Sequence, residues 1–326
     1  MNYAINKGRV ISYLMIAGLF FVAGCWTVVR AQDEVIRVES SLVSVPVTVL
    51  DRDGRHLTNL QKSNFRVYEE GTVQEIEVFE PVDTKISVVL LLDVSGSMMF
   101  DMQELEAAAE SFVHNLRPYD QIMVATFSDQ IKTVRDFSTV EQFRKRDPMK
   151  LRIDGRPPVT MVYDAADFAL KKVARVKGRQ AIVFLTDGIG DGIWSSQKSN
   201  FKLAEEGDAS IYTIGFDTNP SAQSKYESND IYQKRLAAAS NAVVYLQDLA
   251  RKSGGRAFRI ANIQSLNQTF GEVVKELSRQ YTLGYYSNQP GKDGERRKIT
   301  VKVNVPNVAV RSRNEVIYKK PKRDIR

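Results

Sequence analysis

The sequence predicts a doubly wound α/β domain with a mostly parallel sheet, inserted into a small β-sandwich built from the two ends of the chain. Between residues 85 and 280, short apolar runs alternate with amphipathic helical stretches, as in a parallel sheet covered on both faces. Residues 33–84 and 281–318 instead alternate polar and apolar residues between turn sequences, as antiparallel strands do. With 326 residues, the chain has room for two folded bodies.

The first 31 residues are typical of an export signal, because two basic residues precede an apolar run over 10–24 that is short for a membrane span. Two cleavage sites are open. Residues 22–25 resemble a bacterial lipobox, with cleavage after residue 24 and a lipid on Cys25, whereas residues 29–31 suit ordinary cleavage after residue 31. Cys25 is the only cysteine, and its position favours the lipobox. We expect the protein in the periplasm or cell envelope, touching a membrane only through its signal or lipid.

Strand-like patterns occur at both ends of the remaining chain. In the N-terminal segment, an alternating run over 42–49 precedes a turn at 51–54, and residues 65–68 and 76–79 read as a hairpin around 70–71. In the C-terminal segment, the expected strands cover 281–286, 297–303 and 308–310. Because neither set has enough strands to bury an apolar face alone, we expect the two segments to pair.

The middle of the chain alternates strands and helices whose ends carry capping signals. The expected elements, in order, are a strand over 86–92, a helix over 102–116 capped by Asp101, a strand over 122–127, a capping box at 138–141, a helix over 161–173, a strand over 181–186, a further helix, a strand over 211–216, a helix over 235–252 ending at 253–255, a strand over 257–260 and a helix over 266–279.

Polar side chains follow two of the buried strands. Asp93, Ser95 and Ser97 come directly after the strand at 86–92, Asp187 follows the strand at 181–186, and Thr160 precedes the helix at 161–173. In open α/β sheets, ligands bind outside the carboxyl ends of the strands, where these residues are expected. All five supply oxygen, the donor atom that hard cations such as Mg²⁺ prefer. Alone, each feature is also an ordinary turn or cap, but their combined order favours a metal site.

Residues 93–98 (Asp-Val-Ser-Gly-Ser-Met), Thr160 and residues 185–188 (Leu-Thr-Asp-Gly) resemble the metal-ion-dependent adhesion site of von Willebrand factor type A (VWA) domains, over about residues 85–280. The resemblance implies that Ser95, Ser97 and Thr160 are hydroxyl ligands, direct or through water, while Asp93 and Asp187 act mostly through water. It also implies Mg²⁺, with Mn²⁺ or Ca²⁺ as alternatives, and a carboxylate from a protein partner that completes the metal shell. The chain departs from the family at 157–159 (Pro-Pro-Val), where glycines often precede the threonine. The flanking segments resemble those of VWA-related bacterial exported proteins.

Other polar residues near this motif receive weaker assignments. Asp164 and Asp167 are interpreted as a helix-dipole partner and a solvated position, with no ligand role. Asp191 and Trp194 belong to a loop that should border the site, so both are candidate partner contacts, although Trp194 would also suit a cover for the sheet edge. The polar stretch 217–234 is either a specificity loop or an ordinary insertion.

These observations favour a metal-dependent binding or adhesion module and not an enzyme. The chain has only two histidines, His56 and His114, and one cysteine, which are too few for most zinc sites and for most nucleophilic active sites. One alternative is a VWA subunit of an ATP-driven remodelling or metal-insertion assembly, which the export signal opposes. Another is a metal-dependent hydrolase, which lacks a general base. The net charge of +7 is concentrated near the C-terminus, and the basic tail over 319–326 lacks the aromatic residues of nucleic-acid motifs. We expect neither nucleic acid nor a small-molecule substrate as ligand.

Overall fold

The computed structural model describes residues 42–98, 102–152, 160–217, 228–289 and 291–318, which belong to one unit spanning residues 40–326. The predicted export signal over 1–31, Cys25, the cap at Asp101, residues 157–159 and the basic tail over 319–326 lie outside the described residues. Within the described ranges, none of the helices combines the length and apolar composition that a membrane crossing requires.

The central sheet has six strands in the order β10-β9-β8-β5-β6-β7. All neighbouring pairs are parallel except β6 and β7, so the predicted mostly parallel sheet is confirmed. Every residue of β5 is buried, as expected for a strand covered on both faces. The strands are β5 (Ile86–Asp93), β6 (Gln121–Phe127), β7 (Ile131–Thr139), β8 (Arg179–Thr186), β9 (Ser210–Phe216) and β10 (Arg256–Ile260).

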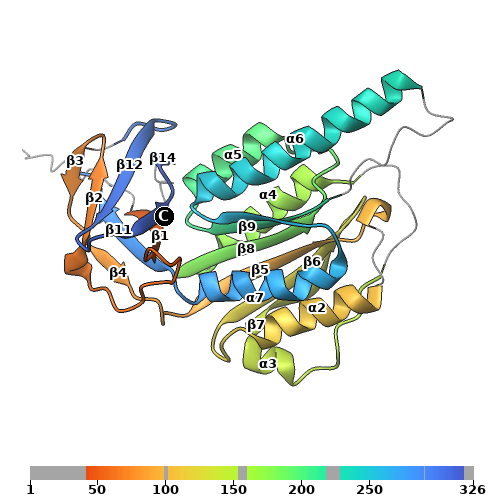
Figure 1. The fold of residues 1–326 in the computed structure, drawn as a ribbon, viewed down its shortest axis with the longest axis horizontal. Coiled ribbons are helices and arrows are strands. Elements are labelled where there is room, and N and C mark those ends of the chain that lie inside the picture. Colours follow the sequence, from red (N-terminus) through yellow and green to blue (C-terminus); the bar gives the residue numbers. More distant parts are fainter. Residues whose placement is uncertain (1–41, 99–101, 153–159, 218–227, 290, 319–326) are drawn as a thin grey trace, which may run out of the picture. The chain divides into compact units, whose positions relative to one another are not determined.

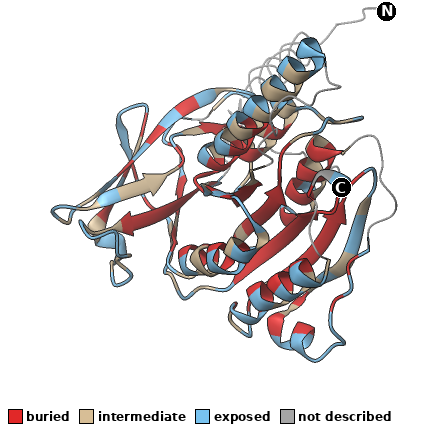
Figure 2. Ribbon diagram, turned by 45° about the vertical axis from the view of Figure 1, so that its right-hand side comes forward, coloured by how far each residue is buried: buried red, intermediate tan, exposed pale blue. Residues whose placement is uncertain are grey.

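Helices cover both faces of this sheet, as predicted for a doubly wound domain (Figure 1). On one face α2 and α7 pack together, with the rings of Phe112 and Phe270 4.9 Å apart. On the other face α4, α5 and α6 bury a second apolar cluster that includes Tyr245. Buried residues therefore fill the inner strands of this sheet, and exposed residues lie on the outer sides of the helices (Figure 2). The helices are α2 (Met102–His114), α3 (Val140–Arg144), α4 (Val162–Val173), α5 (Gln197–Glu206), α6 (Asn229–Ser253) and α7 (Leu266–Leu277), with 3₁₀ turns η1 (Lys62–Asn64), η2 (Gly96–Met98) and η3 (Ile263–Ser265).

The edge strand β7 was not among the expected strands, because its exposed and half-buried residues lack a continuous apolar run. The capping box before α3 is also one residue later than predicted. Thr139, not Ser138, caps the helix by accepting a hydrogen bond from the backbone N–H of Gln142, and the Gln142 side chain accepts one from the Thr139 N–H.

Helix α6 begins earlier than the sequence predicted. Residues 229–234, expected to be part of a long connection over 217–234, form the first turns of this helix. Of that expected connection, residues 218–227 lie outside the described residues. The Ser228 side chain caps the helix, and Lys234 lies 2.8 Å from Asp230 one turn earlier, so a polar sequence is stabilised as helix. The predicted C-terminal cap is confirmed, since Gly254 adopts a left-handed φ of 79°. Figure 1 shows the N-terminal half of α6 extending past the sheet.

The N- and C-terminal segments pair in two four-stranded sheets, β13-β1-β11-β4 and β14-β12-β2-β3. In each sheet, an N-terminal strand lies antiparallel to a C-terminal one, as β1 does with β11 and β2 with β12. The predicted sandwich is therefore present. The strands are β1 (Leu42–Leu50), β2 (Phe65–Glu69), β3 (Thr72–Gln74), β4 (Val78–Glu80), β11 (Tyr281–Tyr286), β12 (Arg296–Val303), β13 (Ala309–Ser312) and β14 (Glu315–Ile317).

The expected hairpin around residues 70–71 is only partly correct. Glu70 and Gly71 both have positive φ and join β2 to β3, as a two-residue hairpin requires. The next strand, β4, pairs with β11 in the other sheet instead of continuing the hairpin. The buried Ile76 lies between these strands and packs into the sandwich core, so the chain crosses from one sheet to the other at this point.

Two arginines of the α/β domain hold its entry and exit connections together. Arg179 donates hydrogen bonds to the carbonyl oxygens of Val82 and Thr84 before β5 and to that of Leu277 at the end of α7. Arg117 likewise bonds to the connections before β5 and after α7. The sandwich therefore adjoins the amino end of β5, and the carboxyl end of β5 is the far end, about 23 Å away for eight residues of strand.

Candidate metal centre

The candidate centre begins where two adjacent strands end. Asp93 is the last residue of β5, and Thr186 is the last residue of the neighbouring β8, directly before Asp187. Both carboxylates are buried, with Asp93 0% and Asp187 4% exposed. Two acidic side chains are thus withdrawn from water at the same edge of the sheet, which is costly unless other groups compensate their charge.

The Asp93 carboxylate is fixed by two hydrogen bonds. One oxygen accepts from the backbone N–H of Ser95 at 2.9 Å, and the other accepts from the hydroxyl of Thr186 at 2.7 Å. Burial, with a smaller contribution from the negative charge of Asp187, raises the pKa of Asp93 to about 7, against the hydrogen bonds from Ser95 and Thr186 that lower it. The two carboxylates therefore repel each other, and a cation between them would relieve that repulsion.

The turn after β8 is equally tight. The Thr186 hydroxyl accepts a hydrogen bond from the Gly188 N–H at 2.9 Å, and Asp187 accepts one from the Ile189 N–H at 2.9 Å. Gly188 has a φ of 73°, and a Cβ there would lie 3.1 Å from the Cβ of Ala242 in α6. Thr186, which was not among the predicted ligands, therefore organises both Asp93 and the loop that follows Asp187.

Backbone hydrogen bonds bring Thr160 to the same edge. The N–H of Val94 bonds to the carbonyl of Phe127, and the N–H of Met161 bonds to the carbonyl of Ser128, the next residue, at 2.7 Å. Residues 93–95 and 160–161 thus both adjoin the end of β6. The Thr160 carbonyl also accepts from the N–H of Asp191 at 3.0 Å.

The five predicted ligands differ in how fully the structure places them. It brings Asp93, Ser95 and Asp187 together and holds half-buried Thr160 at the same edge. Ser97 belongs to η2 in the same turn as Ser95, and its side chain lies outside the described residues. Within the part of the chain that the structure describes, no cluster of three or more His, Cys, Asp or Glu side chains is arranged to hold a metal ion. The donor set of two acids with hydroxyls fits a hard cation such as Mg²⁺, which takes few protein carboxylates and keeps several waters.

Asp164 does more than the sequence suggested. It lies in the first turn of α4 but is buried, and its carboxylate accepts hydrogen bonds from the backbone N–H groups of Ile193 at 2.6 Å and Trp194 at 3.0 Å. Asp167, expected at a solvated position, is half-buried with its side chain 15% exposed, and it pairs with Lys171 at 2.6 Å on the same helix. Asp164 therefore positions the loop after Asp187.

The loop containing Asp191 and Trp194 borders the candidate centre, as its sequence position predicted. Exposed Asp191 exchanges backbone hydrogen bonds with Thr160 and Tyr163. Trp194 is 81% exposed, so it does not cover the sheet edge. The two histidines lie elsewhere, since His56 bridges to Leu50 in the sandwich and His114 ends α2.

Comparison with known proteins gives one family. Residues 88–189 match the model of the von Willebrand factor type A domain, a range that includes all five predicted ligands. Similar solved structures include an aerotolerance-related membrane protein from Bacteroides fragilis, which is 14% identical, with 59% of this chain and 99% of that chain covered and a TM-score of 0.38. A von Willebrand factor type A protein from Catenulispora acidiphila is 10% identical, with 87% and 75% covered and a TM-score of 0.43. An ArnB paralog from Sulfolobus acidocaldarius is 14% identical, with 85% and 76% covered and a TM-score of 0.43. No curated protein matches the chain.

Proposed function

Because this chain contains a von Willebrand factor type A domain, we propose that it is a non-enzymatic binding protein of the bacterial cell envelope that recognises a protein partner through Mg²⁺. The observation that carries the proposal is the pair of buried carboxylates, Asp93 and Asp187, at the carboxyl ends of β5 and β8. A bound cation would compensate the charge of these buried acids, and hydroxyl-bearing residues lie beside them.

Each residue has a distinct task in this proposal. Ser95, Ser97 and Thr160 supply neutral hydroxyl oxygens, while Asp93 and Asp187 hold the site anionic. Thr186 fixes the Asp93 carboxylate through its hydroxyl. Mg²⁺, when bound, supplies an electrophilic position that attracts a carboxylate from the partner.

The cellular setting rests on the chain's first residues. Two basic residues and the apolar run over 10–24 support export, with the mature protein either anchored through a lipid on Cys25 or cleaved after residue 31. A non-enzymatic role is supported by the positions of the two histidines, because neither His56 nor His114 adjoins the candidate centre to act as a general base.

The first test measures metal binding itself. Calorimetric titration of the full chain with MgCl₂ should show one site, which is lost in Asp93→Ala and Asp187→Ala. Asp167→Ala is the matched control, since Asp167 is a half-buried acid of α4 that pairs with Lys171 instead of facing the candidate centre's loop. Unchanged Mg²⁺ affinity in Asp93→Ala would show that the ion binds elsewhere.

The second test concerns the partner. Immobilised protein is incubated with cell-envelope extract in Mg²⁺ or in EDTA, and the retained proteins are compared. We expect a partner that is retained only with Mg²⁺ and only by chains with an intact Asp93. Retention that is equal in EDTA would remove the metal from the recognition mechanism.

A further inference from the structure

The loop after Asp187 presents two adjacent apolar side chains to solvent. Trp194 is 81% exposed and Ile193 is 64% exposed, more than any other large apolar side chain in the described residues. Single exposed apolar residues are common on protein surfaces, but an adjacent pair beside a candidate binding site is informative. Tryptophan in particular is enriched at the energetic centres of protein interfaces.

Hydrogen bonds and close packing fix the backbone of Ile193 and Trp194. Asp164 accepts hydrogen bonds from the backbone N–H groups of both Ile193 and Trp194. Close packing adds to this, because a Cβ on Gly190 would lie 2.3 Å from the Thr160 carbonyl oxygen and one on Gly192 would lie 2.2 Å from the Ser195 carbonyl oxygen. The two side chains are therefore exposed on an ordered backbone, which reduces the entropy lost when a partner binds.

The same hydrogen bonds give the spacing to the metal centre. Asp191 bonds to the carbonyl of Thr160, while Ile193 and Trp194 bond to Asp164, four residues further along the chain. Thr160 lies two residues before α4 and Asp164 lies in its first turn, so the anchor points are close together, separated by about the length of one helical turn of 5.4 Å. In an extended peptide, residues two positions apart are separated by about 7 Å.

We propose that Ile193 and Trp194 form an apolar contact surface that selects partner segments with an aliphatic or aromatic residue within two positions of the acidic residue that meets the metal. Asp164 is the positioning residue of this surface. The proposal rests on the proposed metal-dependent function and adds a rule for partner choice. A protein segment that offers a single carboxylate to the metal fits better than an anionic membrane surface, because the exposed Asp191 in the same loop, outside the proposed ligand set, would repel further anionic headgroups.

The test uses two dye-labelled probe peptides with one glutamate each. In the first, leucines stand two positions to either side of the glutamate, and in the second, serines replace them. Binding to the full chain in Mg²⁺ is followed by fluorescence anisotropy. We expect the leucine peptide to bind about tenfold more tightly, because it buries apolar surface against Trp194. Trp194→Ala and Ile193→Ala should reduce this preference, whereas Tyr286→Ala, an exposed aromatic of the sandwich, should leave it unchanged.

Asp164 has its own readout. Asp164→Ala should weaken binding of the leucine peptide more than binding of the serine peptide, and Asp167→Ala should change neither. Because the chain has only two tryptophans, Trp26→Phe leaves Trp194 as the only tryptophan, whose emission can be excited selectively. Its emission should shift to shorter wavelength when the leucine peptide binds.

The outcomes separate the two proposals. Both proposals are supported if Asp93→Ala binds neither peptide and Trp194→Ala binds the leucine and serine peptides with equal affinity. A leucine preference that persists in EDTA but disappears in Trp194→Ala supports the apolar surface and contradicts the metal mechanism. A full preference in Trp194→Ala overturns the apolar surface. A shift of Trp194 emission with phosphatidylglycerol vesicles and not with peptide also overturns the apolar surface. The absence of binding by either peptide at millimolar concentration overturns it as well.

Discussion

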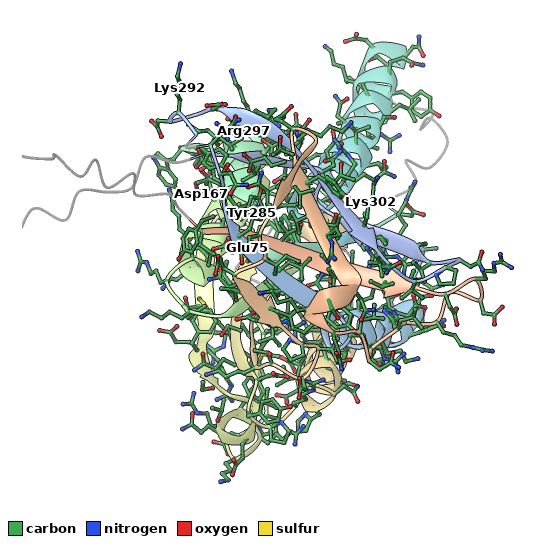
Figure 3. The ribbon with its side chains drawn as sticks, turned by 90° about the vertical axis from the view of Figure 1, so that its left-hand side faces the viewer. Glu75, Asp167, Tyr285, Lys292, Arg297 and Lys302 are labelled. Carbon is green, nitrogen blue, oxygen red and sulfur yellow. The ribbon has the colours of Figure 1, made fainter. Side chains whose placement is uncertain are left out.

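Glu69→Gln tests whether the two ends of the chain form one stable sandwich. Glu69 lies on β2, is 3% exposed, and accepts hydrogen bonds from four groups contributed by the C-terminal segment. These are the hydroxyls of Tyr285 at 2.7 Å, Tyr318 at 2.6 Å and Ser287 at 2.6 Å, and the guanidinium of Arg297 at 2.6 Å. Figure 3 looks onto this sandwich, with Tyr285 and Arg297 labelled.

The expected loss in the free energy of unfolding depends on which of the groups that contact Glu69 lose their partner in Glu69→Gln. Removing one member of a buried ion pair costs about 3–5 kcal/mol. The Arg297 side chain is 9% exposed but retains a second partner, Glu295 at 2.7 Å, so we expect a loss near the lower limit, about 3 kcal/mol. Exposed Glu75, also labelled in Figure 3, provides the control, because Glu75→Gln should change the free energy of unfolding by less than about 0.5 kcal/mol.

The difference in the free energy of unfolding between the wild type and Glu69→Gln should become smaller as the pH falls. Burial alone would raise the pKa of Glu69, but hydrogen bonds from Ser287, Tyr318, Tyr285 and Arg297 bring it below its usual value of 4.5. A lowered pKa stabilises the folded protein above the unfolded-state pKa, and this contribution is lost as the pH falls through the folded-state value. Urea unfolding followed by circular dichroism should therefore show the full difference at pH 7 and a smaller one below about pH 4. Equal stability of the variant at pH 7, or a difference that widens in acid, would refute the reasoning.

Three further predictions concern the metal, the loop and the junction with the sandwich. Mg²⁺ at a hundred times its Kd should raise the free energy of unfolding by about 2.7 kcal/mol in thermal melts, and Asp93→Ala should abolish this gain. Gly190→Ala places a methyl group against the Thr160 carbonyl, so calorimetry should show weaker Mg²⁺ binding with an unchanged circular dichroism spectrum. Arg313→Leu leaves three backbone carbonyl oxygens without their buried donor and should cost about 3 kcal/mol in urea unfolding.

The sequence predicted the elements whose environment leaves a pattern in their own residues. Strands β5 and β8 are continuous apolar runs because both faces of the sheet are covered, and this also located Asp93 and Asp187 at their ends. Strand β7 is an edge strand with a polar side, so its sequence resembles a loop. The crossing of β4 into the second sheet was likewise hidden, since the choice between sheets depends on pairing with β11, about 200 residues away.

Asp164 shows why part of the candidate site could not be predicted. Its partners are backbone N–H groups 29 and 30 residues away, and any residue except proline offers such a group. An acid in the first turn of a helix already has an ordinary explanation in the helix dipole, so nothing in the local sequence indicates a second role. The prediction of Thr160 rested mainly on its order in the chain relative to the strands and the following helix, because a threonine before a helix is usually a cap.

The arrangement of the two bodies makes stability and recognition separable. The sandwich adjoins β5 at Ile86, whereas Asp93 ends the same strand about 23 Å away. Glu69→Gln should therefore lower the free energy of unfolding while the Mg²⁺ affinity of the folded protein, measured without denaturant, stays within twofold of the wild type. Asp93→Ala should abolish Mg²⁺ binding but leave unchanged the pH dependence of the free energy of unfolding that Glu69 causes. If Glu69→Gln weakened Mg²⁺ binding as strongly as Asp93→Ala, the sandwich would control the metal centre through the sheet, and the centre could not be treated as an independent site.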